Sequence, residues 1–414
     1  MVQVQTLKIG MIGIGVGGAE ILPAMEAMDA IDVVAGADIV PATLERFSNR
    51  FPSAKTYSSA EALCNDANVE AVWVSSPNRF HAEHTILAAN HGKHVVVEKP
   101  MAVTLKDAER MVEAADKNSV KLLAGHTRAF TLPIRAMRRV IDSGRYGQLR
   151  ALNIWSYSDW ILRPRTADEL DLAQGGGIPY RQGPHQVDTV RLLGGGMLRS
   201  VRAQTGQWMA ERPIPGFYAA FLEFENGTPA TISHNGYGYF LGAELVPWGQ
   251  DRQRYTTAER ASIRSQLRAG TRAESEEKQA LRIGGEQERI IFRRNEPAPW
   301  APEDMGMAIA SLDRADIRQS KYGIYIHSDA GKQEVDVVAG RAMGVAQRRA
   351  ELEELYNAVV GGQPVWHDGR WGMATLEVCL AIMQSARERK EVMLKHQVPV
   401  PEAYDADFPV PEPA

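Results

Sequence analysis

The sequence is poor in cysteine, in excess basic charge and in long apolar runs. Its 414 residues include only two cysteines, Cys64 and Cys379, too few for a disulfide framework or a zinc site held by four thiolates. The formal net charge of −4 at pH 7 argues against a broad basic surface for nucleic acid or anionic lipid. No stretch approaches the roughly 18 to 20 apolar residues of a membrane-spanning helix, and the first residues lack a secretory-signal pattern. We therefore expect a cytoplasmic protein that binds neither nucleic acid nor membranes.

The first 125 residues alternate between strand-like and helix-like segments. Apolar runs typical of buried parallel strands occur at residues 7–14, 32–37, 71–75, 94–98 and 120–125. Helical patterns lie between them at residues 17–29, 41–51 and 104–118. Strands that alternate with helices through short connections predict a doubly wound parallel sheet, so we expect a Rossmann domain over residues 1–125.

The pattern changes after Phe130. Four strand candidates follow a helical segment at 131–143, namely residues 149–157, 197–208, 219–224 and 229–237. Consecutive strands predict an α/β domain with a large, mostly antiparallel open sheet, which we place at residues 126–398. The polar residues 249–294 are expected to form a partly mobile surface insertion, and the proline-rich residues 399–414 an extended tail.

A glycine-rich loop is the first chemical signal. Residues 13–18 match the pattern G-x-G-x-x-G between a predicted strand and a predicted helix. Such glycines let a pyrophosphate approach the helix N-terminus, although a glycine turn also occurs in other α/β proteins. An acidic residue lies 20 positions further on, where a carboxylate can bind the adenosine ribose and would repel a 2′-phosphate. We therefore expect NAD rather than NADP, held by Asp38 and by the loop residues Gly13, Gly15, Val16, Gly17 and Gly18.

Polar side chains follow the next two predicted strands. Ser76, Asn78 and His81 come directly after the strand at 71–75, and Glu98 and Lys99 stand at the end of the strand at 94–98. The carboxyl ends of parallel strands line the nucleotide crevice, so these residues are expected to border the cofactor. A lysine beside a positively charged nicotinamide ring loses its proton more easily and can serve as a base, with Glu98 orienting it. The nearby histidine pairs lack the H-E-x-x-H spacing, and no metal site is expected.

A further signal is the segment Gly175-Gly-Gly-Ile-Pro-Tyr-Arg-Gln-Gly-Pro-His185-Gln-Val-Asp188. It predicts a glycine loop that leads into a helix, with His185 and Asp188 on one face of the first turns. A glycine loop with a histidine satisfied inside the core would have the same pattern.

In this order the four motifs resemble the Gfo/Idh/MocA family of nicotinamide-dependent oxidoreductases. The resemblance covers about residues 7–240 and extends to the helical segment at 371–380. It implies a Rossmann domain followed by an α/β domain whose open sheet often mediates oligomerisation, so a homo-dimer or homo-tetramer is expected. It also implies that Lys99 and His185 are catalytic.

One position departs from the family pattern. The loop usually reads G-G-G-x-x-x-D-x-G-x-H, and Arg181 stands where the aspartate would contact sugar or polyol hydroxyls. A guanidinium group suits a carboxylate bound in two-pronged fashion and is a poor proton acceptor, which points to a small anionic substrate. The residues expected to bind this substrate are Arg181, Tyr180, His126, Arg128, Trp160, Arg163 and Arg165.

Within the family, residues 177–186, 315–320 and 369–373 are similar to dehydrogenases of carboxylated cis-dihydrodiols of the phthalate or benzoate type. This similarity implies oxidation of a ring hydroxyl to give a catechol product, with the hydride passing to the nicotinamide and with Lys99 and His185 relaying the proton. Three alternatives stay open: a sugar-acid or inositol-like polyol dehydrogenase, an NAD-dependent glycosidase, and a non-catalytic protein that senses NAD.

Overall fold

The computed structural model describes residues 5–126, 128–249, 253–285, 300–302, 306–337 and 343–410. These residues form two compact units, each drawn from separate stretches of the chain. The first unit contains the chain up to residue 126 together with residues 276–285 and 344–376. The second contains the described residues between 128 and 275, between 300 and 343, and between 377 and 410. None of the helices in these ranges combines the length and the apolar character needed to cross a membrane.

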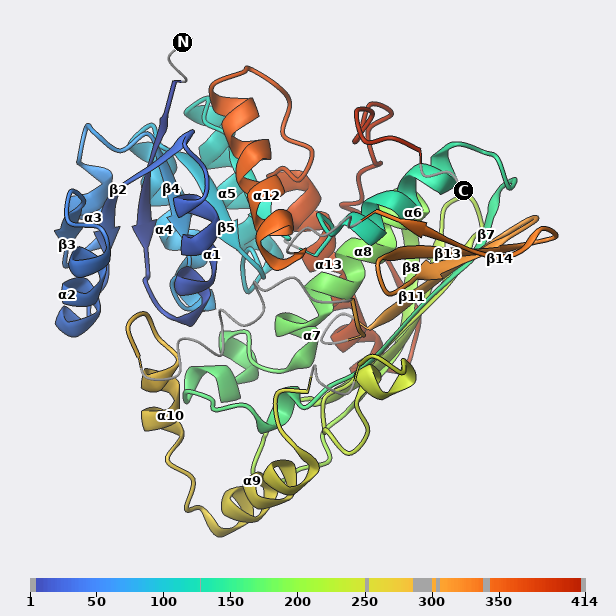
Figure 1. Cartoon of the computed structure of the whole chain (residues 1–414). Helices are drawn as coiled ribbons and strands as arrows, with labels where there is room; N and C mark the ends of the chain where they lie inside the picture. Colours follow the sequence, from blue (N-terminus) through green and yellow to red (C-terminus); the bar gives the residue numbers. More distant parts are fainter. Residues whose placement is uncertain are drawn as a thin grey trace. The chain divides into compact units, whose positions relative to one another are not determined.

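A parallel sheet of six strands forms the centre of the first unit (Figure 1). Its strands are β1 (Leu7–Ile12), β2 (Ile31–Ala37), β3 (Lys55–Tyr57), β4 (Ala71–Val74), β5 (His94–Glu98) and β6 (Leu122–Gly125). They lie in the order β3-β2-β1-β4-β5-β6, and every neighbouring pair is parallel. The predicted doubly wound sheet is confirmed, and its direction of winding reverses between β1 and β4, where such sheets open a crevice.

Helices flank this sheet, because a parallel sheet is stable only when both faces are covered. They are α1 (Val16–Glu26), α2 (Pro41–Arg50), α3 (Ala60–Cys64), the 3-10 turn η1 (Asn78–Phe80), α4 (His81–Asn90) and α5 (Leu105–Lys117). A helix from far along the chain, α12 (Met343–Val359), joins the same core, where Leu352 and Leu355 are buried with Ile9 and Val96. Residues 344–376 therefore belong with the first unit, which differs from the expected second domain at 126–398 because the apolar side of α12 is buried here.

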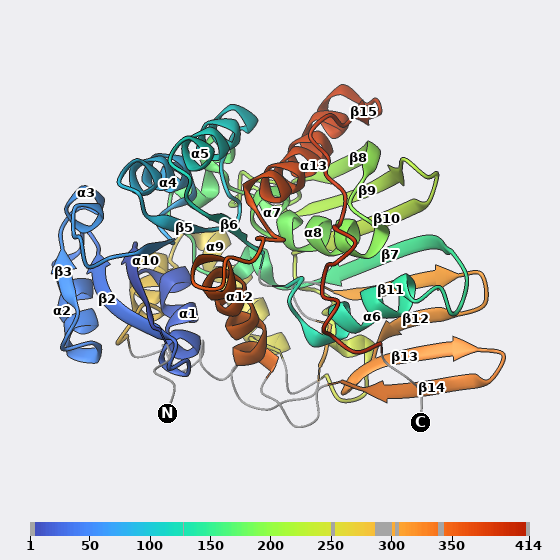
Figure 2. The same cartoon turned by 90° about the horizontal axis from the view of Figure 1, so that it is seen from above.

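An open sheet of nine strands forms the second unit (Figure 2). Its strands are β7 (Leu149–Tyr157), β8 (Leu198–Gly206), β9 (Phe217–Phe224), β10 (Pro229–Asn235), β11 (Met307–Leu312), β12 (Asp316–Gln319), β13 (Gly323–Ser328), β14 (Gly331–Asp336) and β15 (Val392–Met393). Their order is β14-β13-β12-β11-β7-β10-β9-β8-β15, and among these described strands only β7 and β10 pair in parallel. The predicted mostly antiparallel open sheet is confirmed, although only β7 to β10 are predicted from the sequence.

Helices cover one face of the open sheet. They include α6 (Leu132–Asp142), α7 (Ile178–Arg181) and α8 (Gly183–Gly194), and in α8 the Gln186 amide donates a 3.1 Å hydrogen bond to Ser233 O of β10. Side chains that point to the covered face, such as Ile154, are buried. Alternate positions point the other way and stay half-exposed, among them Trp155 and Phe221. This alternation is typical of an antiparallel sheet with one packed face. The helix α13 (Gly369–Glu388) begins in the first unit and ends in the second.

The polar insertion at 249–294 is largely helical where the structure describes it. The helix α9 (Thr257–Ala269) buries Ile263 and Leu267, and α10 (Glu274–Ala280) follows. Further on, Ile283 is buried in the core of the first unit. Residues 250–252 and 286–294 of the insertion lie outside the described residues. The described part of the insertion is therefore held in place by buried side chains, which a loop that lies only on the surface would lack.

The proline-rich end packs against the second unit, which differs from the expected extended tail. Val400 N donates a 3.0 Å hydrogen bond to Gly195 O. Arg135 of α6 forms an ion pair with Asp405, and its guanidinium lies 4.5 Å from the centre of the Phe408 ring. Residues 402–407 form turns, and Asp405 and Phe408 both contact Arg135 of α6. Residues 411–414 lie outside the described part of the chain.

Candidate functional site

Close packing shapes the loop between β1 and α1. Gly13 has a φ of +84°, and a Cβ there would lie 2.6 Å from Ser76 N, so only glycine fits. Gly18 is packed as tightly, because a Cβ would lie 2.6 Å from Gly13 O. By contrast, apart from its chain neighbours and the nearby backbone of α1, a Cβ placed on Gly15 or Gly17 would have no atom of the described residues within 4 Å. The outer glycines fold the loop, and the middle two leave open space before α1 where a pyrophosphate would fit.

The Asp38 carboxylate ties this loop to the end of β2. Its Oδ2 accepts a 2.9 Å hydrogen bond from Ile14 N, and its Oδ1 accepts one of 2.9 Å from Val40 N. Each oxygen can accept a second hydrogen bond, so Asp38 is still able to bind ribose hydroxyls. The next side chain, Ile39, is exposed and offers no cation for a 2′-phosphate. An aspartate that can accept hydrogen bonds from ribose hydroxyls, followed by a side chain without positive charge, fits NAD.

His81 joins the loops that follow β4 and β5. Its Nε2 lies 2.7 Å from Ser76 O, and its Nδ1 lies 2.8 Å from Pro100 O. The ring is buried, as is Asn78 at the start of η1. Because Pro100 directly follows Lys99, in a cis peptide, His81 fixes the backbone next to the lysine. The structure therefore gives His81 a supporting position between two predicted site loops.

Lys99 stands among ionisable side chains at the carboxyl end of β5. Burial raises the pKa of the neighbouring Glu98 carboxyl, while the charges of Arg348 and Lys99 act in the opposite direction. Arg348 comes from α12 and forms an ion pair with Glu20 of α1. Glu351 of α12 is buried beside the end of β6, the strand next to β5. A carboxylate with a perturbed pKa beside a lysine, as Glu98 is beside Lys99, is common at functional sites, so this end of β5 is a candidate for proton transfer.

In the second unit, α7 and α8 carry the residues of the histidine motif. Tyr180 and Arg181 lie in α7, and His185 and Asp188 lie in the first turns of α8, as the spacing predicts. All but Arg181 are buried, and Asp188 is completely so. Burial raises the pKa of the Tyr180 hydroxyl to about 12, so this group stays neutral and can donate a hydrogen bond.

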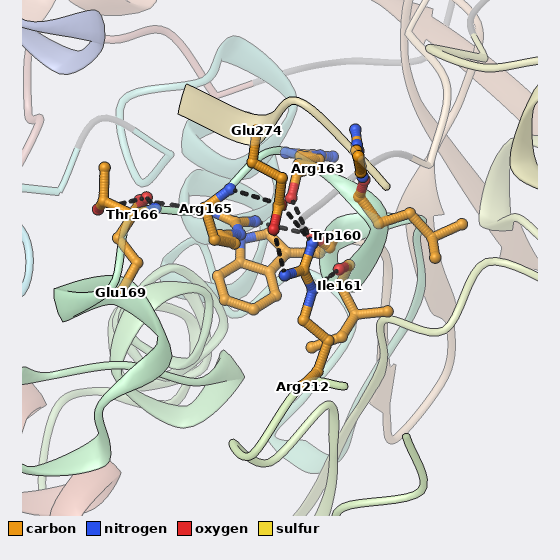
Figure 3. Close-up of polar contacts among 10 residues, drawn as sticks. Trp160, Ile161, Arg163, Arg165, Thr166, Glu169, Arg212 and Glu274 are labelled. Carbon is orange, nitrogen blue, oxygen red and sulfur yellow. Dashed lines mark hydrogen bonds and ion pairs between the residues drawn. The ribbon is translucent and has the colours of Figure 1, made fainter. Parts of the chain in front are cut away.

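Two of the predicted arginines share one buried carboxylate. Arg181 Nη2 lies 3.2 Å from Glu169 Oε1, and Arg165 Nη1 lies 3.5 Å from the same oxygen. The other oxygen, Oε2, accepts hydrogen bonds of 2.9 and 3.0 Å from N and Oγ1 of Thr166 (Figure 3). Glu169 is 5% exposed, whereas the Arg181 side chain is 20% exposed. The structure thus brings Arg165 and Arg181 together through a third residue.

Trp160 and Arg163, two more of the predicted substrate-binding residues, lie in the same segment of the chain as Arg165. The Arg165 guanidinium is 3.6 Å from the centre of the Trp160 ring, and Arg165 Nη2 donates a 2.7 Å hydrogen bond to Trp160 O. Trp160 is buried, so the guanidinium covers one face of the indole (Figure 3). Arg163 has a carboxylate of its own, since its Nε lies 3.3 Å from Asp159 Oδ1.

An ion pair between Arg212 and Glu274 holds the segment that carries Arg163 and Arg165. Arg212 is 1% exposed and donates hydrogen bonds of 2.8 and 2.5 Å from Nη1 and Nη2 to the two carboxylate oxygens of Glu274. Glu274 Oε1 also accepts a 3.0 Å hydrogen bond from Arg165 N (Figure 3). Burial alone would raise the pKa of Glu274, but the hydrogen bonds and charge of Arg212 outweigh it and hold that pKa below its usual range. Arg212 Nε reaches Ile161 O at 3.0 Å, so the pair fixes the segment at two places.

The two remaining predicted residues fall in different units. His126 is buried just after β6 in the first unit. Arg128 precedes α6 in the second unit, and its carbonyl oxygen accepts a 2.9 Å hydrogen bond from Thr131 Oγ1. In the described part of the chain, no three His, Cys, Asp or Glu side chains gather in a way that could hold a metal ion.

The sequence motifs miss several charged residues of these groups, and one of them, Glu169, has a local signal. Thr166-Ala-Asp-Glu169 matches the T-x-x-E pattern in which a glutamate returns to the threonine backbone, and the observed hydrogen bonds are of that kind. Arg212 and Glu274 are 62 residues apart, and Arg348 and Glu20 are 328 residues apart. No local pattern could identify those pairs.

Two family models match consecutive parts of the sequence. Residues 7–126 match an oxidoreductase family with an NAD-binding Rossmann fold, and residues 134–240 match the C-terminal domain of Gfo/Idh/MocA proteins. The first match confirms the predicted cofactor class and the predicted oxidoreductase activity. The protein has an NAD-binding Rossmann domain.

Comparisons with individual proteins agree with the family match. The chain is 32% identical over 392 residues to the 1-carboxy-3-chloro-3,4-dihydroxycyclo hexa-1,5-diene dehydrogenase of Comamonas testosteroni, covering 92% of this chain and 95% of that one. It is 35% identical over 146 residues to an inositol 2-dehydrogenase of Salmonella typhimurium, covering 34% of this chain and 44% of that one. A crystal structure of a protein from Bordetella bronchiseptica RB50 has a TM-score of 0.84 and 30% identity, covering 94% of this chain and 100% of that one. The chain therefore belongs to the Gfo/Idh/MocA family of NAD-binding oxidoreductases.

Proposed function

We propose that this oxidoreductase oxidises a ring hydroxyl of a carboxylated cis-dihydrodiol, of the phthalate or benzoate type, to a catechol product. The observation that carries the proposal is Arg181, a partly exposed guanidinium at a position where the family usually has an aspartate. The relative from Comamonas testosteroni supports the same substrate class, because its name describes a carboxylated dihydroxycyclohexadiene.

Arg181 is the proposed carboxylate-binding residue. A guanidinium binds a carboxylate through two parallel hydrogen bonds, which fixes the plane of the ring as well as its position. Arg165 is a second positive charge near Arg181, because both arginines contact the carboxylate of Glu169. A neutral polyol offers no charge to this group and loses the acceptor that an aspartate would supply.

Lys99 is the proposed proton acceptor, with His185 sharing the transfer. A neutral lysine takes the proton of the ring hydroxyl, and the imidazole bonds the same or a neighbouring hydroxyl. The glycine loop and Asp38 hold the cofactor, which takes the hydride from the substrate carbon when it is bound. The dienone that results tautomerises to a catechol, and aromatisation makes the overall oxidation favourable.

The substrate class is tested by NADH formation with a panel of compounds. Purified protein and NAD⁺ are incubated with carboxylated cis-dihydrodiols, the same diols without the carboxylate, myo-inositol and gluconate. We expect turnover only with the carboxylated diols, and Arg181→Ala should raise their KM about tenfold or more because a charge-assisted pair is lost. Turnover of inositol that survives Arg181→Ala would support a polyol dehydrogenase, and cleavage of a glycoside without net NADH would support a glycosidase.

Replacement of Lys99 tests the proton acceptor. Lys99→Met should lower kcat by about a hundredfold or more, the usual contribution of general-base catalysis, and leave NAD binding nearly unchanged. Steady-state kinetics and calorimetric titration with NAD measure the two effects. Lys117→Met, at the exposed end of α5, is the matched control. Near-normal turnover in Lys99→Met would remove the lysine from the mechanism.

Replacement of Asp38 tests the cofactor preference. Asp38→Ala should weaken NAD binding about tenfold and narrow the difference between NAD and NADP, because it removes both the ribose acceptor and the charge that repels a 2′-phosphate. Titration with each cofactor gives the ratio of affinities. Asp32→Ala, an exposed position on β2, should keep the wild-type ratio. An unchanged ratio in Asp38→Ala would contradict this role.

We also propose that the protein forms a homo-dimer or homo-tetramer through the uncovered face of the open sheet. Trp155 and Phe221 are 45% and 48% exposed, and both lie on the face of Thr231 and Ser233 of β10. Large apolar side chains on an uncovered sheet face favour burial against a second copy. Light scattering after gel filtration should give a multiple of the chain mass, and Trp155→Asp with Phe221→Asp should lower it. A wild-type monomer at micromolar concentration would contradict the proposal.

A further inference from the structure

Two arginines bind the backbone of residues 160–165 from outside that segment. Arg212 donates hydrogen bonds of 3.0 Å to Ile161 O and 3.5 Å to Arg163 O. Arg272, from the polar insertion, donates one to the carbonyl oxygen between them. Three consecutive carbonyl groups therefore accept hydrogen bonds from guanidinium groups, and charged side chains set the backbone conformation of the segment.

Glu274 connects these contacts to Arg165. Its Oε1 accepts a 3.0 Å hydrogen bond from Arg165 N, and its two oxygens accept hydrogen bonds from the two terminal nitrogens of Arg212. Arg212 is buried, and Glu274 is the first residue of α10 in the insertion. One carboxylate of the insertion therefore holds both the arginine that binds the segment and the last residue of the segment (Figure 3).

The pair of Arg212 and Glu274 is better suited to setting a position than to adding stability. Withdrawing two charges from water costs about as much free energy as their attraction returns, so an apolar pair of similar volume is often equally stable. An apolar pair, however, has no donor or acceptor for the backbone of residues 160–165. Arg212 and Glu274 supply hydrogen bonds to three of its backbone groups, which an apolar pair could not replace.

Arg165 is the residue whose place these contacts determine. Its guanidinium lies over the Trp160 ring and donates to Trp160 O, while Nη1 contacts Glu169. Burial lowers the pKa of the guanidinium to about 9, so the group is charged at neutral pH. Its side chain is 7% exposed, and its buried Nε–H has no acceptor among the described residues. A buried, charged donor without an acceptor is costly, and a carboxylate oxygen is the partner that suits it.

We propose that Glu274 is a positioning residue for substrate recognition: it holds Arg165 where the Nε–H group of that arginine donates to a carboxylate of the substrate. The ring carboxylate is taken from the proposed function, on which this inference rests. Glu274 acts through Arg212 and through the backbone of Arg165. The polar insertion thereby takes part in recognition through contacts to the backbone of residues 160–165.

The test compares a charged ligand with a neutral one. Calorimetry on the whole protein with saturating NADH measures the affinities for 3,4-dihydroxybenzoate and for 3,4-dihydroxybenzamide, which has nearly the same shape. The wild-type protein should prefer the benzoate. Arg212→Met combined with Glu274→Met removes the pair without changing the net charge, so a change in this preference comes from position.

In this double variant the preference for the benzoate should fall about tenfold or more, because the donor to the carboxylate is displaced. The affinity for the benzamide should change little. The melting temperature should stay within about 5 °C of the wild type, since two apolar side chains replace two buried charges.

A milder variant decides the question if the double variant does not fold. Glu274→Asp keeps the charge that Arg212 requires, but its side chain is one methylene group shorter and cannot reach Arg212 and Arg165 N together. The preference for the benzoate should fall about threefold or more, the effect of losing one hydrogen bond. The matched control is Arg349→Met with Glu353→Met, which removes a half-exposed ion pair of α12 and should keep the full preference.

The outcomes separate this role of Glu274 from the proposed function. A full preference in the folded variants, with oxidation of carboxylated diols by the wild type, would overturn the inference and leave the proposed function standing. An equal loss of affinity for both ligands would also overturn it, because Glu274 would then support the segment without a part in carboxylate recognition. A preference that is lost in the variants, without oxidation of any diol by the wild type, would support the inference and contradict the proposed function. A wild-type protein without a preference for the benzoate would contradict both.

Discussion

Parallel strands bring their carboxyl ends to one edge of a sheet, and the first unit is organised by this constraint. The glycine loop follows β1, Asp38 follows β2, Ser76 follows β4 and Lys99 follows β5, so groups spread over most of the domain lie at one edge of the sheet. Close backbone packing and hydrogen bonds to the backbone determine the shape of the loops at this edge. Tight glycine contacts shape the loop after β1, and His81 bridges the loops after β4 and β5. The loops at this edge of the sheet are therefore held by glycine packing and by the hydrogen bonds of His81.

The second unit follows a different rule, because it buries charge. A guanidinium or carboxylate withdrawn from water is costly unless it is paired and hydrogen-bonded. Arg212 meets this requirement with Glu274, and Arg163 does so with Asp159. Arg165 and Arg181 both contact the same oxygen of the buried Glu169 carboxylate.

The sequence predicts the first unit well because its motifs act locally. Gly13, with its positive φ, and Asp38, which accepts a hydrogen bond from the loop, belong to one short sequence motif. The strands can be predicted because they are rich in apolar residues. The histidine motif is equally local, and α8 begins where the spacing places it. Family membership then follows from the order of these motifs.

The rest depends on contacts between distant residues. The strands β11 to β14 are short and lie between segments with no clear pattern, so alternation alone does not reveal them. Glu274 sits in a polar stretch whose charges look solvated, and only its contact with Arg212 shows otherwise. Nor does the apolar side of α12 indicate which core it enters, because Leu352 and Leu355 would suit either unit. The proline-rich end misleads for the same reason, since its partners on α6 are far away in sequence.

The place of α12 in the first core has a consequence for how the chain folds during synthesis. The strands of that core have all been made once residue 125 leaves the ribosome, yet Leu352 and Leu355 are still missing from it. At ~5 to 20 residues per second, the interval before α12 emerges is roughly 10 to 50 s. During that time the incomplete sheet exposes an apolar surface, and every strand of the second sheet except β15 is translated. The apolar surface that α12 covers therefore waits for a later part of the chain, and the first unit reaches its final stability only after residues 343–359 have been translated.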